Sequence, residues 1–319
     1  MKRSALIFMM AAGVLPAAEF FDGKTLAGWT VCNGTAAYRV ENGEIVGKTA
    51  VGSPNSFLCT EKTYGDFVLE YETKTDTRLN SGVQIRAHRY ARETQVVTEN
   101  KGKQKRTHPA GRVYGYQVET ATEASGASGS VYDEARRGWV ANMSAVEPCK
   151  SAFKDNEWNR YRVEARGDRI RTWVNGAACV DMVDPMDMEG FIGLQVHQFK
   201  GDPPAEVRWR NFKFQDQGRH EWKPLENGAR ISESTIRLRY KLPQGAAKIR
   251  LGSGVVELEP MVGDGWNELT ISAHGGRVVA HVNGEKRMDE KIAPGKWTGT
   301  LVADGAAEMT DLQVLRSAK

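Results

Sequence analysis

The sequence predicts an all-β protein, an antiparallel β-sandwich followed by a smaller β-sandwich-like domain. Short runs that alternate apolar and polar residues, or that are rich in β-branched residues, recur roughly every ten residues with turn-forming residues between them. Helix-compatible stretches are few and short. A segment from the middle of the chain is also repeated near its C-terminal end, which indicates a second, related sandwich.

The expected strands of the first domain are punctuated by turn signals. Asn42-Gly43 and Asn175-Gly176 are Asn-Gly pairs of the kind that adopts the positive φ angles of a tight hairpin turn, so the register of the strands around them is well specified. The expected strands lie at 38–47, 66–74, 81–88, 114–120, 161–176, 191–197 and 206–214.

The repeat defines the second domain. The segment 158–176, WNRYRVEARGDRIRTWVNG, recurs at 266–284 as WNELTISAHGGRVVAHVNG, with the same order of strand, turn, strand and Asn-Gly pair. A polar, proline-containing stretch precedes the second copy. We therefore expect a sandwich over 19–216 and a smaller, degenerate one over 227–319.

The N-terminal segment has the order of a secretory signal peptide. Basic Lys2 and Arg3 precede an apolar stretch from Ala5, and small residues end at Ala18. The apolar stretch is too short to span a membrane, and no second one follows. We expect a signal peptide over 1–18, a secreted or periplasmic location, and no membrane span.

Charge and cysteine content limit the function classes. The 44 basic and 40 acidic residues give a formal net charge of +4, which argues against nucleic acid as the main partner. The cysteines Cys32, Cys59, Cys149 and Cys179 lack the close pairing of a zinc site. Three disulfide connectivities are open, as is a set of free buried thiols.

Strand alternation places hydrogen-bonding side chains on one face of several strands. In the segment 81–88 the expected apolar face is Val83, Ile85 and Ala87. Amide, guanidinium and imidazole groups recur on the opposite faces, where simple solvation prefers Lys, Glu and Thr, so this pattern favours ligand recognition. The polar faces are Gln84, Arg86 and His88 in one strand, Gln117 and Glu119 in the next, and Gln195 and His197 in the third.

The segment YDEARRGWV, 132–140, combines two carboxylates, two guanidinium groups and a tryptophan. This mixture is typical of a site that binds a sugar and moves protons around it. Arg136 and Arg137 either contact the substrate or hold Asp133 and Glu134 structurally. Trp139 either stacks on a pyranose ring or packs in the core.

The chain resembles the 3-keto-disaccharide hydrolase domain family, which has a concanavalin A-like lectin/glucanase jelly-roll sandwich. The resemblance covers 20–215. It is carried by FFDGKTLAGW, NSGVQIRAH, GYQVE, SGSVYDEARRGW, EWNRYRVEARGDRIRTWVNG, GFIGLQVH and VRWRNFKF, in that order. The chain departs from the family in a long basic insertion at 93–108 and in the small pair Ala127-Ser128 before Gly129.

The resemblance implies that the protein acts on 3-keto-glycosides. A ketone at the third ring carbon acidifies the neighbouring hydrogen, so a base can remove it, the aglycone can leave, and water can add. His197 or Glu119 is the expected base, and Asp133 or Glu134 the expected acid or water-positioning group. Arg86 together with Gln195 or Gln117 is expected to bind the ketone or its enolate. The full predicted site is Glu119, His197, Asp133 and Glu134 for catalysis, with Asn80, Gln84, Arg86, Gln117, Tyr132, Arg136, Arg137, Trp139 and Gln195 for substrate binding.

Several alternatives stay open at this stage. No cofactor is evidently required and no metal ligand is assigned, but a divalent metal ion is left open, with the four catalytic candidates as its ligands. A non-catalytic carbohydrate-binding module and a cell-surface interaction protein are the rival functions. The substrate is a carbohydrate, and a companion sugar dehydrogenase is left open as the source of the ketone, because this chain has no dinucleotide-binding glycine fingerprint.

Overall fold

The computed structural model describes residues 20–98, 104–226, 234–241, 247–251, 254–258, 265–274, 276–291, 302–304 and 308–317. The expected signal peptide at 1–18 lies outside these residues, as do parts of the expected domain at 227–319. The chain divides into two compact units. The larger holds most of the chain up to Gly218, and the smaller contains Arg219–Lys319 with two short segments, Arg166–Ile170 and Met182–Met188. Within the described ranges no helix is long and apolar enough to cross a membrane.

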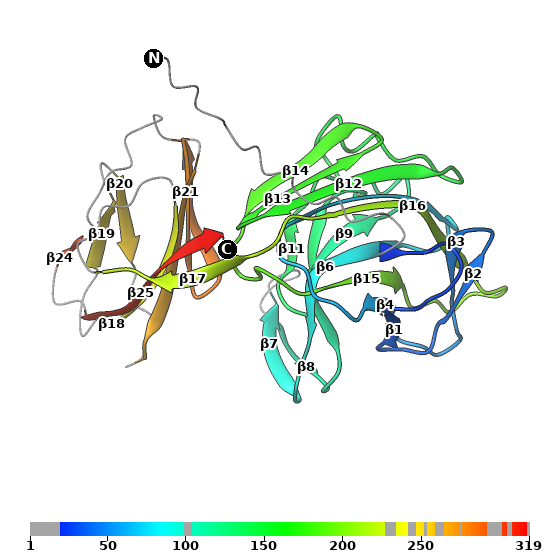
Figure 1. Ribbon diagram of the computed structural model, residues 1–319, viewed down its shortest axis with the longest axis horizontal. Helices are drawn as coiled ribbons and strands as arrows, with labels where there is room; N and C mark the ends of the chain where they lie inside the picture. Colours follow the sequence, from blue (N-terminus) through cyan, green and yellow to red (C-terminus); the bar gives the residue numbers. More distant parts are fainter. Residues whose placement is uncertain are drawn as a thin grey trace, which may run out of the picture. The chain divides into compact units, whose positions relative to one another are not determined.

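Two seven-stranded antiparallel sheets form the larger unit and face each other (Figure 1). This confirms the predicted jelly-roll sandwich, and the strands are built from the alternating segments expected from the sequence. One sheet has the order β1 (Trp29–Cys32), β4 (Ser56–Thr60), β15 (Phe191–Val196), β6 (Ser81–Arg89), β9 (Val113–Thr120), β10 (Val131–Glu134) and β11 (Gly138–Ala141). The other has the order β14 (Ala177–Val183), β13 (Arg169–Val174), β12 (Asn159–Arg166), β5 (Phe67–Thr75), β16 (Glu206–Asp216), β3 (Glu44–Lys48) and β2 (Ala37–Glu41).

The core of the larger unit lies between its two sheets. Ile45, Leu69 and Trp209 from one sheet and Val83 and Leu194 from the other are fully buried. Each belongs to a strand whose alternate residues point to the outer face, so burying one face leaves the other for function. The first sheet carries the candidate site on its outer face.

A two-stranded hairpin, β7 (Thr94–Thr98) and β8 (Gln104–His108), forms a separate sheet in the larger unit and projects from the sandwich (Figure 1). It is formed by the basic insertion noted in the sequence. At its base the Tyr90 ring stacks on Tyr114, with 4.2 Å between ring centroids, and on His108, with 5.8 Å. The Tyr90 hydroxyl donates to the carbonyl oxygen of Ala135 at 3.0 Å, so the hairpin is anchored where it leaves the sandwich.

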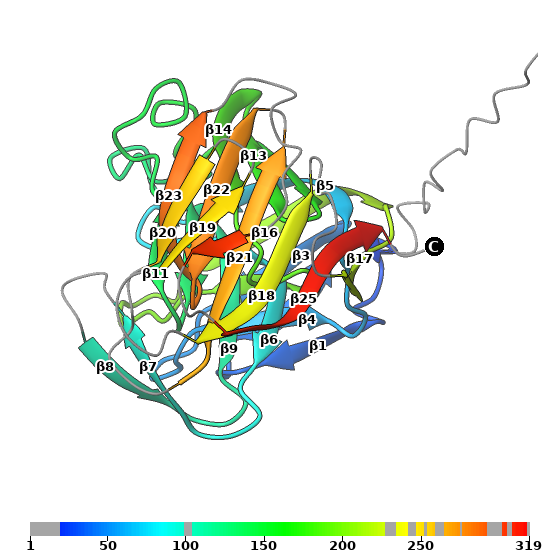
Figure 2. The same ribbon diagram turned by 90° about the vertical axis from the view of Figure 1, so that its left-hand side faces the viewer.

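The smaller unit contains a six-stranded and a three-stranded antiparallel sheet (Figure 2). This confirms the predicted second β domain. The six-stranded sheet has the order β17 (His220–Pro224), β25 (Glu308–Ser317), β18 (Thr235–Lys241), β21 (Asn267–His274), β22 (Arg277–Val282) and β23 (Glu285–Lys291). The three-stranded sheet has the order β20 (Gly254–Leu258), β19 (Ala247–Leu251) and β24 (Val302–Asp304).

The sequence repeat forms the same hydrogen-bonded corner in both units. Asn175 at the end of β13 has φ of 49°, and its side-chain oxygen accepts the Arg160 backbone N–H at 2.8 Å while its amide donates to Asn159 at 2.8 Å. In the second unit Asn283, with φ of 50°, accepts the Glu268 N–H at 2.8 Å and donates to the second copy's asparagine, Asn267, at 2.9 Å. The repeated asparagines therefore tie each hairpin turn back to the start of the neighbouring strand.

One disulfide closes the larger unit. Cys149 and Cys179 are bonded, while Cys32 and Cys59 are free and buried. The bond joins the loop after β11 to the edge strand β14, so it holds a long irregular segment onto the sandwich. The sequence had left the pairing open.

Removing this bond should destabilise the larger unit. The bridged cysteines are 30 residues apart, and closing a loop of that length contributes about 3 to 4 kcal/mol to the free energy of unfolding. We expect the double variant Cys149→Ala, Cys179→Ala to lose this amount in urea unfolding followed by tryptophan fluorescence. Reductant should lower wild-type stability to the level of the variant and leave the variant unchanged; equal stability of the two oxidised proteins would contradict the prediction.

Candidate active site

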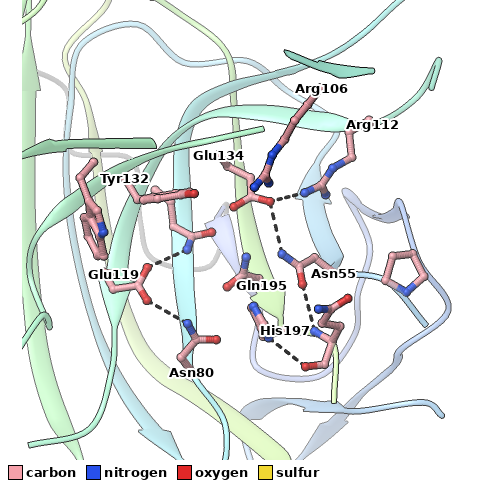
Figure 3. A pocket seen from close by; sticks show the side chains of 13 residues that line it. Asn55, Asn80, Arg106, Arg112, Glu119, Tyr132, Glu134, Gln195 and His197 are labelled. Atoms are coloured by element: carbon pink, nitrogen blue, oxygen red, sulfur yellow. Dashed lines mark hydrogen bonds and ion pairs between the residues drawn. The ribbon is translucent and has the colours of Figure 1, made fainter. Parts of the chain in front are cut away.

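A pocket of about 450 Å³ opens on the outer face of the first sheet (Figure 3). Its lining residues come from strands β8, β9, β10, β11 and β15, from the loops before β4, β6 and β9, and from the loop after β15. Its volume lies within the range of small-molecule sites. It is lined by Pro54, Asn55, Asn80, Arg106, Arg112, Gln117, Glu119, Tyr132, Glu134, Trp139, Gln195, His197 and Gln198.

A row of polar residues crosses the sheet beneath the pocket. The register pairs Gln84 with Gln117, and Gln117 with Tyr132, so their side chains share one face. The Gln84 amide donates to Gln117 Oε1 at 2.8 Å, and the Gln117 amide donates to Glu119 Oε2 at 2.9 Å. This relay fixes which end of the Gln117 amide faces the carboxyl group.

Gly82 makes room for this relay. It lies opposite both Glu119 and Gln195 in the register of the sheet. A Cβ atom at this position would lie 2.6 Å from Gln117 Cγ and 2.9 Å from its Nε2. Residue 82 is therefore a glycine because any larger side chain would overlap the Gln117 side chain, which extends across it to Glu119.

Glu119 is the most perturbed carboxyl group of the pocket. It is 5% exposed, and its two oxygens accept hydrogen bonds from Gln117 at 2.9 Å and from Asn80 at 3.1 Å. Burial and, to a smaller extent, the charge of Glu134 raise the pKa of Glu119, the two amide donors lower it, and the resulting pKa is about 8. A carboxyl group with a pKa this close to neutrality is suited to proton transfer.

Glu134 lies in the same pocket on a different strand (Figure 3). It forms an ion pair with Arg112, and its Oε1 also accepts the side-chain amide of Asn55 at 3.2 Å. Asn55 in turn accepts the backbone N–H of Gln198 at 3.0 Å. This network ties β10 to the loops before β4 and after β15, and it balances the charge of Glu134 with that of a guanidinium group.

Several buried polar atoms at the pocket have no hydrogen-bond partner among the residues that the structure describes. Both side-chain atoms of Gln195 are unpartnered although the residue is 0% exposed. The same holds for Asn80 Oδ1 and Arg112 Nη1. Each buried polar group without a hydrogen bond costs about 1 to 3 kcal/mol of folding free energy. The presence of such groups around a cavity therefore indicates a polar ligand.

The rim of the pocket is aromatic on one side and carries a histidine on the other. Trp139 meets Tyr132 edge to face, with 5.0 Å between ring centroids. His197 Nδ1 lies 2.8 Å from the carbonyl oxygen of Gln198. A carbonyl oxygen only accepts hydrogen bonds, so Nδ1 carries the proton and Nε2 is the other proton-transfer atom of the ring.

Arg86 does not reach the pocket, and the alternation expected for 81–88 breaks at this residue. Arg86 has φ of 47° and lies where the pairing of β6 with β9 shifts. This bulge turns Arg86 inward, where it is 0% exposed, donates from Nε to the Gly65 carbonyl oxygen at 2.7 Å and pairs with Asp66 at 3.2 Å. Ala87, expected in the core, instead joins a small apolar cluster with Cys59 and Phe191.

Asp133 lies on the opposite face of β10 from Tyr132 and Glu134. It pairs with Tyr116 in the register, is 0% exposed, and is held by the guanidinium groups of Arg136 and Arg137. None of these three charged residues lines the pocket. The arginines therefore hold a carboxylate structurally, one of the two roles left open by the sequence.

The structure brings together eight of the predicted residues and adds others. Gln84 does not line the pocket but supports Gln117 from below. The residues brought together are Asn80, Gln117, Glu119, Tyr132, Glu134, Trp139, Gln195 and His197, and those that sequence reasoning missed are Pro54, Asn55, Arg106, Arg112 and Gln198. Four of the missed residues lie in loops, where alternation gives no signal, and Arg106 lies in the basic insertion.

Metal binding was left open by the sequence. Among the residues that the structure describes, no three His, Cys, Asp or Glu side chains gather closely enough to hold a metal ion. Asp133, one of the four proposed ligands, is turned away from the other three.

A jelly-roll sandwich with buried amide and carboxyl groups and two aromatic rings around one pocket defines a carbohydrate-active protein. The match to known families agrees. The chain belongs to the 3-keto-alpha-glucoside-1,2-lyase-like domain family, whose model matches residues 16–215. No protein of curated function matches the sequence.

Solved structures resemble this chain at low identity. A provisionally assigned glycosyl hydrolase from Parabacteroides distasonis matches 62% of this chain and 92% of its own, at 18% identity and a TM-score of 0.40. A carbohydrate binding module from Bacillus subtilis matches 59% of this chain and 95% of its own, at 18% identity and a TM-score of 0.34. A protein of unknown function with a galectin-like fold, also from Bacillus subtilis, matches 60% and 90%, at 8% identity and a TM-score of 0.35. No residue role follows from likeness at these values.

The raised pKa of Glu119 should appear in the pH dependence of stability. Between the ordinary pKa of 4.5 and about 8, the folded protein keeps a proton that the unfolded chain releases, so raising the pH weakens folding. We expect the stability of wild type relative to Glu119→Gln to fall by about 4 kcal/mol, an order-of-magnitude figure, between pH 5 and 8.

Urea unfolding across this pH range measures the effect. The exposed Glu157→Gln variant is the control, and its stability should follow that of wild type at every pH. A difference between wild type and Glu119→Gln that does not change with pH would show that Glu119 does not bind its proton more tightly in the folded state.

Proposed function

We propose that this protein cleaves 3-keto-glycosides by elimination of the aglycone followed by addition of water. The observation that carries the proposal is the buried Glu119 carboxyl group, with a pKa of about 8, facing a pocket with unpartnered amide groups. Family membership supports the substrate class. Stacking surfaces and amide groups suit a pyranose ring, and a near-neutral carboxyl group suits abstraction of a weakly acidic proton.

The proposed reaction begins at the carbon between the ketone and the anomeric centre. Glu119 removes the C2 proton, and the electron pair moves onto the C3 carbonyl oxygen to form an enolate. The enolate then reforms the carbonyl as the bond between C1 and the aglycone oxygen breaks, which leaves a C1–C2 double bond. Water adds its hydroxyl to C1, and C2 regains a proton. This route needs no oxocarbenium ion and differs from paired-carboxylate hydrolysis.

The pocket residues fit the roles that this reaction requires. The Gln195 amide has an unpartnered Nε2 and can donate to the enolate oxygen. Protonated His197, whose Nδ1–H faces the Gln198 carbonyl, can deliver its Nε2 proton to the departing oxygen. Because Glu134 is paired with Arg112, its proposed role is to orient water. Trp139 and Tyr132 supply the face on which the ring stacks.

The proposal extends to the setting of the reaction. An exported chain would meet glycosides outside the cytoplasm, in line with the signal peptide expected from the sequence. The ketone would be supplied by a separate sugar dehydrogenase that oxidises the C3 hydroxyl.

Removing the proton-accepting group should abolish turnover. We expect purified protein to release nitrophenol from a nitrophenyl 3-keto-glucoside and not from the unoxidised parent. Glu119→Gln should lower kcat/KM by about 10³-fold, within the range of general-base contributions, while Glu157→Gln should match wild type. Deuterium at C2 should slow release by the wild type if C2–H cleavage limits the rate.

The alternative outcomes separate the rival functions. Turnover of both glucosides, with no dependence on Glu119, would contradict the elimination mechanism. Binding with turnover of neither glucoside would identify a carbohydrate-binding module. A His197→Ala variant measured beside these should lose more activity with poor leaving groups than with nitrophenol, because protonating the leaving group matters less for nitrophenol.

A further inference from the structure

One end of the pocket carries two guanidinium groups and one carboxylate. Figure 3 shows Arg106 and Arg112 on the same side as Glu134, with Glu119 on the opposite side. Arg112 is ion-paired with Glu134, which balances one charge of each sign. Arg106 is exposed and has no carboxylate partner among the described residues; its Nη2 donates to Gln104 Oε1 at 3.3 Å.

The remaining carboxyl group of the pocket does not offset this charge. Burial raises the pKa of Glu119 to about 8, so most of the group is protonated at neutral pH. Burial lowers the pKa of nearby His108; the charges of Arg112 and Arg106 lower it as well, and the charge of Glu134 raises it. The pocket therefore has one guanidinium charge in excess.

The fold sets the backbone position of Arg106 beside the pocket. Arg106 lies on β8, two residues before His108, whose ring stacks on Tyr90 at the anchored base of the hairpin. Arg112 lines the same cavity, and among the described residues its buried Nη1 has no acceptor. A guanidinium group without a carboxylate partner and an unsatisfied N–H donor beside a cavity are suited to an anionic oxygen group.

We propose that the pocket contains an anion subsite, formed by Arg106 and Arg112 Nη1, that selects glycosides bearing a single carboxylate. This inference rests on the proposed function, because it assumes that the pocket binds a glycoside. One excess charge matches a monoanion, whereas a phosphate dianion would leave a negative charge unbalanced. The fork of donors on arginine matches the two oxygens of a carboxylate.

Equilibrium binding of matched ligand pairs tests the subsite. The unoxidised glycosides suit this purpose because they bind without elimination on the proposed mechanism. One pair, 4-carboxyphenyl and 4-carbamoylphenyl glucoside, places the charge on the aglycone. The other, phenyl glucuronide and phenyl glucuronamide, places it on the sugar. Calorimetry should give an affinity about tenfold higher for the carboxylate than for the carboxamide in at least one pair.

Two variants on the same strand assign the effect. Arg106→Gln should abolish the preference, and Lys105→Gln, which removes the same charge from an exposed residue outside the pocket lining, should retain it. Equal affinities within both pairs, or a preference that survives in Arg106→Gln, would overturn the proposal.

Phenyl glucoside is neutral, so its binding tests the glycoside site independently of the anion subsite. Binding of phenyl glucoside without any carboxylate preference would overturn the anion subsite alone. If none of the five ligands binds, the subsite is overturned, and release of nitrophenol from the nitrophenyl 3-keto-glucoside then decides whether the glycoside site itself stands.

Discussion

The pocket depends on one constraint, that polar side chains on the face of a buried sheet must be hydrogen-bonded to each other or to a ligand. The relay from Gln84 through Gln117 to Glu119 meets this constraint across two neighbouring strands. It does not include Gln195, whose side-chain amide has no hydrogen-bond partner among the described residues. The network is therefore complete on the side that holds the carboxyl group and incomplete where a ligand would lie. This asymmetry orients Glu119 before any ligand arrives.

The same constraint explains why other charged residues are absent from the pocket. Arg86 and Asp133 are both fully buried, and each has partners of opposite charge or a backbone carbonyl close by. Breaking either pair would leave an uncompensated buried charge, at a cost of about 3 to 5 kcal/mol. Arg86 and Asp133 therefore stabilise the loops and strand ends that they contact. Glu119, Glu134 and His197, in contrast, line the cavity.

Much of the fold and about half of the pocket could be predicted from the sequence. Alternation is a local rule, so it correctly placed Gln117, Glu119 and Gln195 on one face of regular strands. It failed at Arg86 because a bulge with positive φ at an arginine has no signal in the sequence pattern. It also failed to find Asn55 and Arg112, because loop residues reach the pocket only through the tertiary arrangement of the strands they connect. The family motifs predicted the family, which the match over residues 16–215 confirms and which alternation alone left undefined.

The repeated hairpin shows that the asparagine-closed turn can occur without the residues that form the pocket. Both units use the same asparagine pair to close a turn, with matching bonds at Asn175 and Asn283. The pocket, in contrast, is built on other strands, in a sheet to which β12 and β13 do not belong. A unit can therefore retain the hairpin without any of the residues that line the pocket. The turn requires only local hydrogen bonds, whereas the pocket requires residues from five strands and four loops. The repeat alone therefore carries no function into the smaller unit.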